Sequence, residues 1–177
     1  MKLFKRLLAV ALIGVMALTV LAGCTVDPDT VFESDTICQA YDNLTNKASD
    51  DGYSTGTYSR KLSSVAQSMY SAISGAYGFN NGEYSADCDK AAKAAFAKAV
   101  TDGKLPAGST LYVGYLVTNP ASYGSFDYKS VYTDSGYEMA NTIGLYYNGS
   151  NGYLMIVAAY IPASKKLFSP DNKTSKQ

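Results

Sequence analysis

The sequence TIGLYYNGSNGYLMIVAAYI, residues 142–161, decides the fold class. Its two halves, 142–147 (TIGLYY) and 153–161 (YLMIVAAYI), are rich in β-branched and aromatic residues, and NGSNG lies between them. Two such runs joined by five turn-forming residues are typical of a β-hairpin. The second run is almost wholly apolar, which is typical of a strand that is covered on both faces. The sequence therefore predicts a sheet with this strand near its centre.

A third strand is predicted upstream, over residues 109–118 (STLYVGYLVT). Alternation places Leu111, Val113, Tyr115 and Val117 on one face, and Asn119-Pro120 ends the run. Residues 121–141 are rich in Tyr, Ser and Gly and indicate no clear element.

Three helices are predicted before that strand, over residues 34–50, 58–74 and 86–102. The first two show apolar residues at helical spacing, and the third is rich in alanine. Ser34 and Ser85 are suitable N-caps, and Asp87 and Asp89 suit the first turn of the third helix. The order predicts an α+β domain, in which three N-terminal helices pack on a small, mainly antiparallel sheet.

The N-terminus has the pattern of an export signal. Basic residues in 1–6 precede an uncharged apolar run, residues 7–22, which ends at Leu21-Ala22-Gly23-Cys24. A membrane-spanning anchor is the alternative, but the run falls short of the ~20 residues that span a bilayer. The tetrapeptide resembles the lipobox of bacterial lipoproteins. That resemblance implies cleavage before Cys24, acylation of its thiol and anchoring on the extracytoplasmic face of the cell membrane.

The domain organisation follows from this resemblance. We expect a signal peptide over 1–23, lipidated Cys24 with an acidic tether over 24–35, one domain over 36–162 and a flexible polar tail over 163–177. Cleavage removes three of the 15 basic residues and none of the 15 acidic ones, leaving a net charge of about −3. Nucleic acid is therefore not an expected partner, because it requires a basic face.

Cys38 and Cys88 are the two cysteines that remain. An even pair outside the cytoplasm suggests a disulfide, and two buried free thiols are the alternative. Both cysteines fall beside the apolar face of a predicted helix, and we expect them to be bridged.

The chain contains no histidine, which excludes Ser-His-Asp and Cys-His catalysis and any imidazole-bound metal. No metal or other cofactor is expected. Glu83 and Glu138 are the candidate catalytic carboxylates, since such a pair could act as acid and base on a glycosidic bond; the alternative is two solvated loop residues. The 16 tyrosines suggest a contact surface for a glycan or protein, although tyrosine is also common on half-exposed sheets.

The order of several short motifs resembles the CAP superfamily of cysteine-rich secretory and pathogenesis-related proteins. The matching residues are Leu62, Val65, Ala66, Gly82-Glu83, Ser135-Gly136, Asn141, Ile143-Gly144 and Tyr160-Ile161-Pro162. The resemblance implies an α-β-α sandwich with a cleft that contains Glu83. The family's two cleft histidines do not occur here, and Tyr137 stands where one is expected, so the hydrolytic or metal-linked activity of such a cleft is not implied.

From these features we expect a lipid-anchored cell-surface protein that is not an enzyme. Its domain would bind a glycan, a cell-wall component or a protein, with Tyr77, Tyr84 and Tyr137 as candidate binding residues. The alternatives are a cell-wall hydrolase that uses carboxylates and an accessory subunit of an envelope complex.

Overall fold

Strand β4 (Tyr153–Tyr160) lies inside a four-stranded sheet in a computed structural model of the chain. The structure describes residues 28–76, 79, 84–118 and 126–163. β3 (Thr142–Asn148) and β2 (Thr110–Val117) flank β4, and both are antiparallel to it. The short strand β1 (Thr57–Tyr58) runs parallel to β3 and completes the order β1-β3-β4-β2.

The apolar sequence of β4 is explained by burial on both faces. Leu154, Ile156 and Ala158 point into one hydrophobic cluster, and Met155, Val157 and Ala159 point into the other. All six side chains are fully buried. The predicted covered strand is therefore confirmed.

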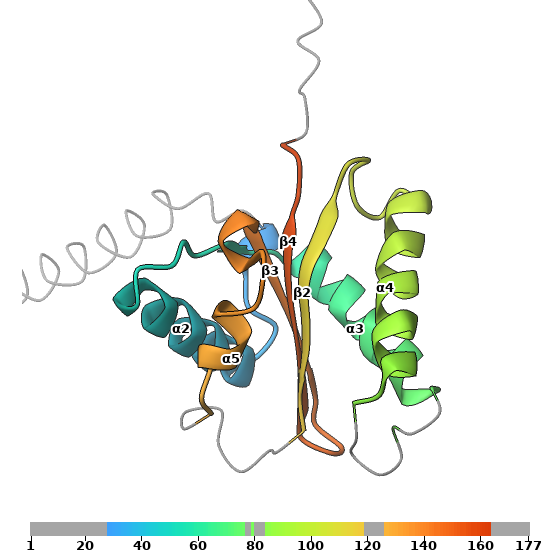
Figure 1. The fold of residues 1–177 in the computed structure, drawn as a ribbon, viewed down its shortest axis with the longest axis horizontal. Coiled ribbons are helices and arrows are strands. Elements are labelled where there is room, and N and C mark those ends of the chain that lie inside the picture. Colours follow the sequence, from blue (N-terminus) through green and yellow to red (C-terminus); the bar gives the residue numbers. More distant parts are fainter. Residues whose placement is uncertain (1–27, 77–78, 80–83, 119–125, 164–177) are drawn as a thin grey trace, which may run out of the picture.

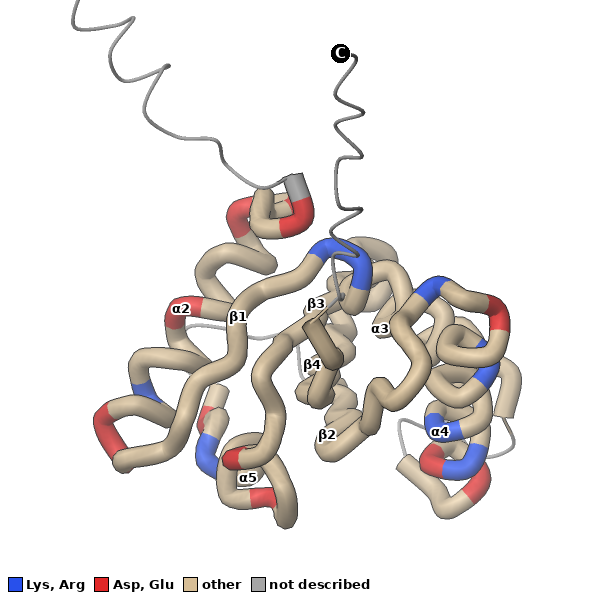
Figure 2. The backbone as a smooth tube through the Cα atoms, turned by 90° about the horizontal axis from the view of Figure 1, so that it is seen from above, with Lys and Arg blue, Asp and Glu red and all other residues tan. Residues whose placement is uncertain are grey.

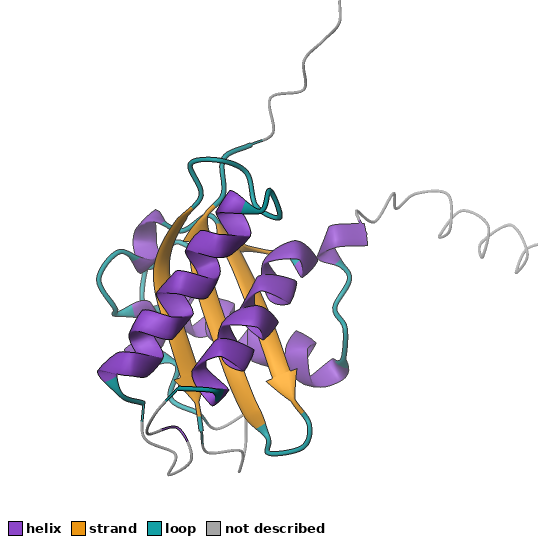
Figure 3. Ribbon diagram, turned by 90° about the vertical axis from the view of Figure 1, so that its right-hand side faces the viewer, coloured by secondary structure: helices purple, strands orange, loops and turns teal. Residues whose placement is uncertain are grey.

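Helices cover both faces of this sheet (Figure 1). α3 (Arg60–Ser74) and α4 (Ala86–Thr101) lie side by side on one face, as Figure 3 shows. α2 (Asp35–Asp50) and the short α5 (Lys129–Tyr132) lie on the other. The α+β class is confirmed. The three predicted helices, however, are divided between two layers and do not form one.

Serine caps fix where the three long helices begin. The hydroxyls of Ser34, Ser59 and Ser85 accept hydrogen bonds from the backbone N–H three residues on, at 3.3, 3.2 and 3.4 Å. Two 3-10 turns, η1 (Pro28–Thr30) and η3 (Tyr137–Met139), complete the described elements. η1 falls within the predicted tether, residues 24–35.

A β-bulge changes the predicted pattern of β2. The pairing with β4 shifts between Leu111 and Val113, which leaves Tyr112 as the extra residue. A bulge reverses the alternation beyond it. Val113, Tyr115 and Val117 face the α2 side, whereas Leu111 packs with the α3 and α4 side. The prediction that Leu111 shares their face is wrong for this reason.

A glycine in β3 allows α3 to lie unusually close to the sheet. A Cβ added at Gly144 would lie 2.5 Å from the carbonyl carbon of Leu62. At the next residue of α3, the buried hydroxyl of Ser63 accepts a 3.0 Å hydrogen bond from the N–H of Leu145. The two-residue β1 does not reach Leu145, so α3 supplies the partner that this edge of β3 lacks.

The predicted bridge between Cys38 and Cys88 is not supported. Both are free cysteines, Cys38 half-buried and Cys88 buried. Cys38 lies on α2, and Cys88 belongs to the cluster beneath α3 and α4, on the opposite face of the sheet. The sheet therefore lies between the two cysteines. Helical periodicity places each cysteine on a helix, but it does not tell which face of the sheet that helix covers.

Candidate functional site

A hollow of about 330 Å³ lies between the first half of α4 and the outer edge of β2. Within the described residues, β2 pairs with β4 alone, so this edge carries no further strand. The residues that line the hollow are Tyr84, Asp89, Ala92, Lys93, Leu111, Tyr112, Gly114 and Asp134. Its volume is at the lower end of the range for small-ligand sites.

The wall on α4 carries an ion pair. Helical spacing places Asp89 and Lys93 on one face, and Lys93 Nζ lies 2.7 Å from Asp89 Oδ2. Tyr84 precedes the Ser85 cap and has 41% of its surface exposed. Partial burial, with the nearby charge of Asp89, raises the pKa of Tyr84 to about 12. Its hydroxyl is therefore neutral at physiological pH and can both donate and accept a hydrogen bond.

The wall on β2 carries Tyr112, whose position depends on two backbone features. The bulge adds Tyr112 to the strand, and bulges commonly redirect a side chain next to a site. Gly136, with a φ of +95°, lies against the ring: an added Cβ would fall 2.7 Å from Tyr112 Cδ1. Any side chain at residue 136 would displace this ring. Asp134, two residues earlier, is the remaining charged residue of the lining.

This arrangement suits recognition better than catalysis. Tyr84 and half-buried Tyr112, which also packs against the core cluster on the α2 side, offer apolar surface with a hydroxyl, and three charged groups offer donors and acceptors. Such a mixture fits a ligand that presents both C–H surface and hydroxyl or amide groups. A glycan has this composition, as does a polar segment of a protein.

The predicted site residues are distributed in different ways. Tyr84 lies in the hollow. Glu138 is exposed on η3 and does not line the hollow. Glu83, Tyr77 and the lipidation residue Cys24 lie outside the described residues.

Tyr137 requires a correction. It has 1% of its surface exposed and packs in the cluster beneath α2, and burial raises its pKa to about 12. A ligand at the surface cannot reach such a ring, so Tyr137 is a core residue. The motif Ser135-Gly136 contributes to the hollow through Gly136, which supports Tyr112, and not through the tyrosine that follows it.

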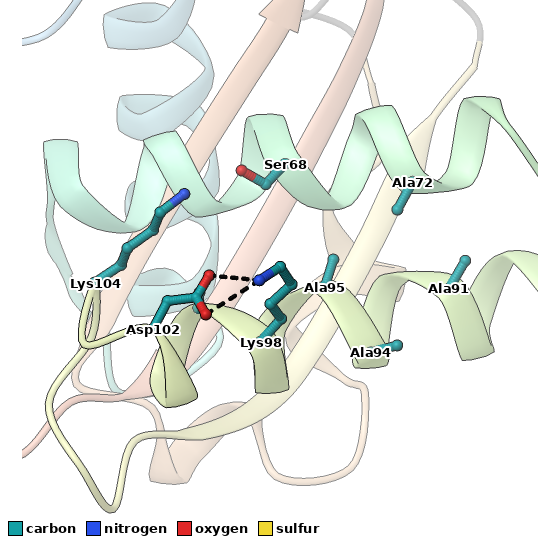
Figure 4. A pocket seen from close by; sticks show the side chains of 9 residues that line it. Ser68, Ala72, Ala91, Ala94, Ala95, Lys98, Asp102 and Lys104 are labelled. Carbon is teal, nitrogen blue, oxygen red and sulfur yellow. Dashed lines mark hydrogen bonds and ion pairs between the residues drawn. The ribbon is translucent and has the colours of Figure 1, made fainter.

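A second, larger hollow of about 490 Å³ lies between α3 and α4 (Figure 4). Small side chains line most of it, among them Ser68, Ala72, Ala91 and Ala95. Its charged end carries the pair Lys98 and Asp102, whose Nζ and Oδ2 atoms are 2.8 Å apart. Methyl groups offer contact area without directional bonds, and this ion pair is already formed, so the hollow beside β2 is the better candidate for specific binding.

No cluster of acidic or cysteine side chains that could hold a metal occurs in the part of the chain that the structure describes. In the same residues, no helix has the length and hydrophobicity to cross a bilayer. Comparison of the chain with protein families, curated proteins and solved structures found no match.

Proposed function

We propose that the protein is a lipid-anchored, extracytoplasmic cell-surface protein whose domain binds a glycan of the cell wall. The anchor is supported by Leu21-Ala22-Gly23-Cys24, placed directly after an uncharged apolar run. Because the described domain begins at Pro28, only three residues separate it from the thiol that would carry the lipid.

Binding is assigned to the hollow beside β2. The observation that carries this assignment is the meeting of Tyr84 and Tyr112 with Asp89, Lys93 and Asp134 in one depression. Tyr84, just before the N-cap of α4, and Tyr112, on β2, supply one tyrosine each, and the bulge and Gly136 position the second ring. The rings would stack on sugar faces while the charged groups hydrogen-bond hydroxyl and amide groups.

Co-sedimentation with purified peptidoglycan tests the assignment. The unlipidated chain carrying Cys24→Ser is compared with the same chain carrying Tyr84→Ala or, as a control, Tyr160→Ala. The control tyrosine is equally exposed, at 43%, but lies at the end of β4 and outside the hollow. An aromatic contact worth about 1 kcal/mol predicts a loss of about fivefold for Tyr84→Ala and no loss for the control. Equal binding by both variants would show that the hollow is not the binding site.

A cell-wall hydrolase is the second candidate, because two carboxylates, Asp89 and Asp134, line the same hollow. Asp89 is already paired with Lys93, so Asp134 is the carboxylate with which this function is tested. Release of soluble fragments from labelled peptidoglycan by the native chain, but not by Asp134→Asn, would establish this function in place of simple binding.

An accessory subunit of an envelope complex is the third candidate. It is favoured by the hollow between α3 and α4, where small side chains would let a partner helix approach closely (Figure 4). Recovery of a partner by the native chain, lost in Ala95→Glu, would support this role.

The likeness to the CAP superfamily belongs to the same proposal. It is supported by helices on both faces of the sheet and by the contact between Gly144 and Leu62, which joins two of the matching motifs. Glu83, the residue of the implied cleft, lies outside the described residues.

A further inference from the structure

Both ends of the described chain lie at one end of the sheet. β4 finishes there, next to the start of β2, since Tyr160 pairs with Thr110. η1 is attached at the same end: Asp29 accepts a 2.8 Å hydrogen bond from Ser59 Oγ and a 2.7 Å bond from the N–H of Lys61. A hollow of about 570 Å³ joins these parts and includes Asp29, Lys61, Lys104, Leu105, Ile161 and Pro162. Figure 1 shows η1, in blue, near the end of β4, in red.

We infer that this end of the domain rests on the headgroups of an anionic phospholipid surface. The inference depends on the proposed acylation of Cys24. Four residues of extended chain span at most about 14 Å, so Pro28 would lie within that distance of the lipidated residue. Because Asp29 binds the start of α3, the chain becomes part of the domain directly after this short span.

The exposed apolar side chains of the domain gather at the same end. Four large apolar residues among those described are exposed: Val31, Tyr84, Met139 and Tyr160. Val31 follows η1, and Tyr160 ends β4. Met139 lies two residues before Asn141, whose side chain bonds both N–H and C=O of Ile161 at 2.8 and 2.9 Å. Only Tyr84 lies elsewhere, in the hollow beside β2.

Two lysines at this end are available for phosphate groups. Arg60 pairs with Glu33 at 3.5 Å and Lys98 pairs with Asp102, whereas neither Lys61 nor Lys104 forms an ion pair within the described residues. Figure 2 looks down on this end and shows the basic residues at the start of α3. After Pro162, the first charged residues of the sequence are Lys165 and Lys166. These lysines form a local basic patch on a chain whose net charge after cleavage is about −3.

Amphipathic aromatic side chains and lysines are what the headgroup region of a bilayer accommodates. This placement also sets the height of the candidate glycan site. Asp89 precedes Asp102, at the end of α4 that lies near the bilayer, by 13 residues, which is about 20 Å along a helix. On the other wall, Tyr112 lies two strand residues, about 7 Å, beyond Thr110, which pairs with Tyr160. The hollow beside β2 would therefore extend from near the headgroups toward the wall.

A single tryptophan tests the inference, since the chain has none of its own. Lipidated full-length protein carrying Tyr160→Trp is reconstituted in phosphatidylglycerol vesicles that contain bromine-labelled lipid. The control is Tyr84→Trp, because the two tyrosines are 43% and 41% exposed. We expect bromine to quench Tyr160→Trp strongly and Tyr84→Trp little.

The lysines are tested with the unlipidated Cys24→Ser chain. Binding to phosphatidylglycerol vesicles should fall about fivefold for each of Lys61→Ala and Lys104→Ala and should be absent on phosphatidylcholine. Binding that is unchanged by either substitution would show that these lysines do not contact the headgroups.

The quenching results separate this inference from the proposed anchor. Equal quenching of the two tryptophans in vesicle-bound protein, or stronger quenching of Tyr84→Trp, would overturn the orientation and leave the anchor intact. Protein that carries no lipid and does not stay with the vesicles would overturn the anchor and the orientation together.

Discussion

Replacing Gly144 with alanine should destabilise the domain more than the same change at Gly114 or Gly149. The new Cβ would lie 2.5 Å from the carbonyl carbon of Leu62 and 2.7 Å from both its carbonyl oxygen and its Cγ. Carbon atoms in contact prefer about 3.5–4.0 Å, so α3 would have to move by about 1 Å. Two of the three atoms are backbone, and no change of rotamer relieves them.

The expected cost is about 3 kcal/mol, the upper part of the usual range for overpacking. For a chain of this length that corresponds to a fall in Tm of about 6–12 °C. The assay is urea unfolding followed by far-ultraviolet circular dichroism, with the soluble Cys24→Ser chain as the reference.

The other two glycines calibrate the measurement. At Gly149 the nearest atom to an added Cβ is 3.9 Å away, so Gly149→Ala should lie within about 0.5 kcal/mol of the reference. Gly114→Ala should be intermediate, because its neighbours at 3.2 and 3.6 Å are the flexible Cε atoms of Met69 and Met155. If Gly144→Ala and Gly149→Ala unfold at the same urea concentration, the close approach of α3 to β3 is wrong.

Three further predictions concern the cysteines and the buried tyrosines. Cys24→Ser should release the protein from membranes, and a variant that stays fully membrane-bound with its apolar segment uncleaved would show that residues 7–22 are the anchor. In the unfolded, non-reduced Cys24→Ser chain, a thiol reagent should label two cysteines, and in the folded chain half-buried Cys38 should react faster than buried Cys88. A mass spectrum in which the unfolded chain carries no label would show a disulfide. Burial raises the pKa of Tyr128 and Tyr137 from 10 to about 12, so the folded state retains protons that the unfolded state releases. Stability should therefore be complete below about pH 10 and fall as the pH rises toward 12, and a urea midpoint unchanged over that range would contradict their burial.

Local sequence patterns are sufficient to predict most of the regular elements. The caps Ser34 and Ser85, the Ala-rich helix and the hairpin around NGSNG depend on neighbouring residues alone, and all appear as predicted. Apolar residues at successive positions of β4 also predict that helices cover both of its faces, as the two clusters confirm. Periodicity does not say which face of the sheet a helix covers, and for that reason the structure does not support the expected bridge between Cys38 and Cys88.

The candidate site is less predictable because it depends on contacts between distant residues. The Gly/Asn-rich surroundings of Tyr84 single it out, whereas the position of Asp89 indicates only a role at the helix start. Nothing in the sequence singles out Tyr112, because a bulge has no clear signature in a run such as TLYVGYLV. Gly136 is part of a motif, but its support of the Tyr112 ring follows only from the fold.

The location of both chain ends at one end of the sheet affects how the protein can be labelled. A fluorescent protein or affinity tag fused to the C-terminus would be joined through residues 164–177 to the end that carries Lys61 and Lys104, and a tag at the N-terminus would be lost with the proposed signal peptide. The turn after Asn148, closed by a 2.8 Å bond from Gly152 N to Asn148 O, lies at the other end of β4. Eight strand residues separate the two ends by about 26 Å. An epitope inserted at Gly149 would therefore lie at the end of the domain opposite the proposed lipid anchor, and in the proposed orientation it would be the part of the sheet farthest from the membrane.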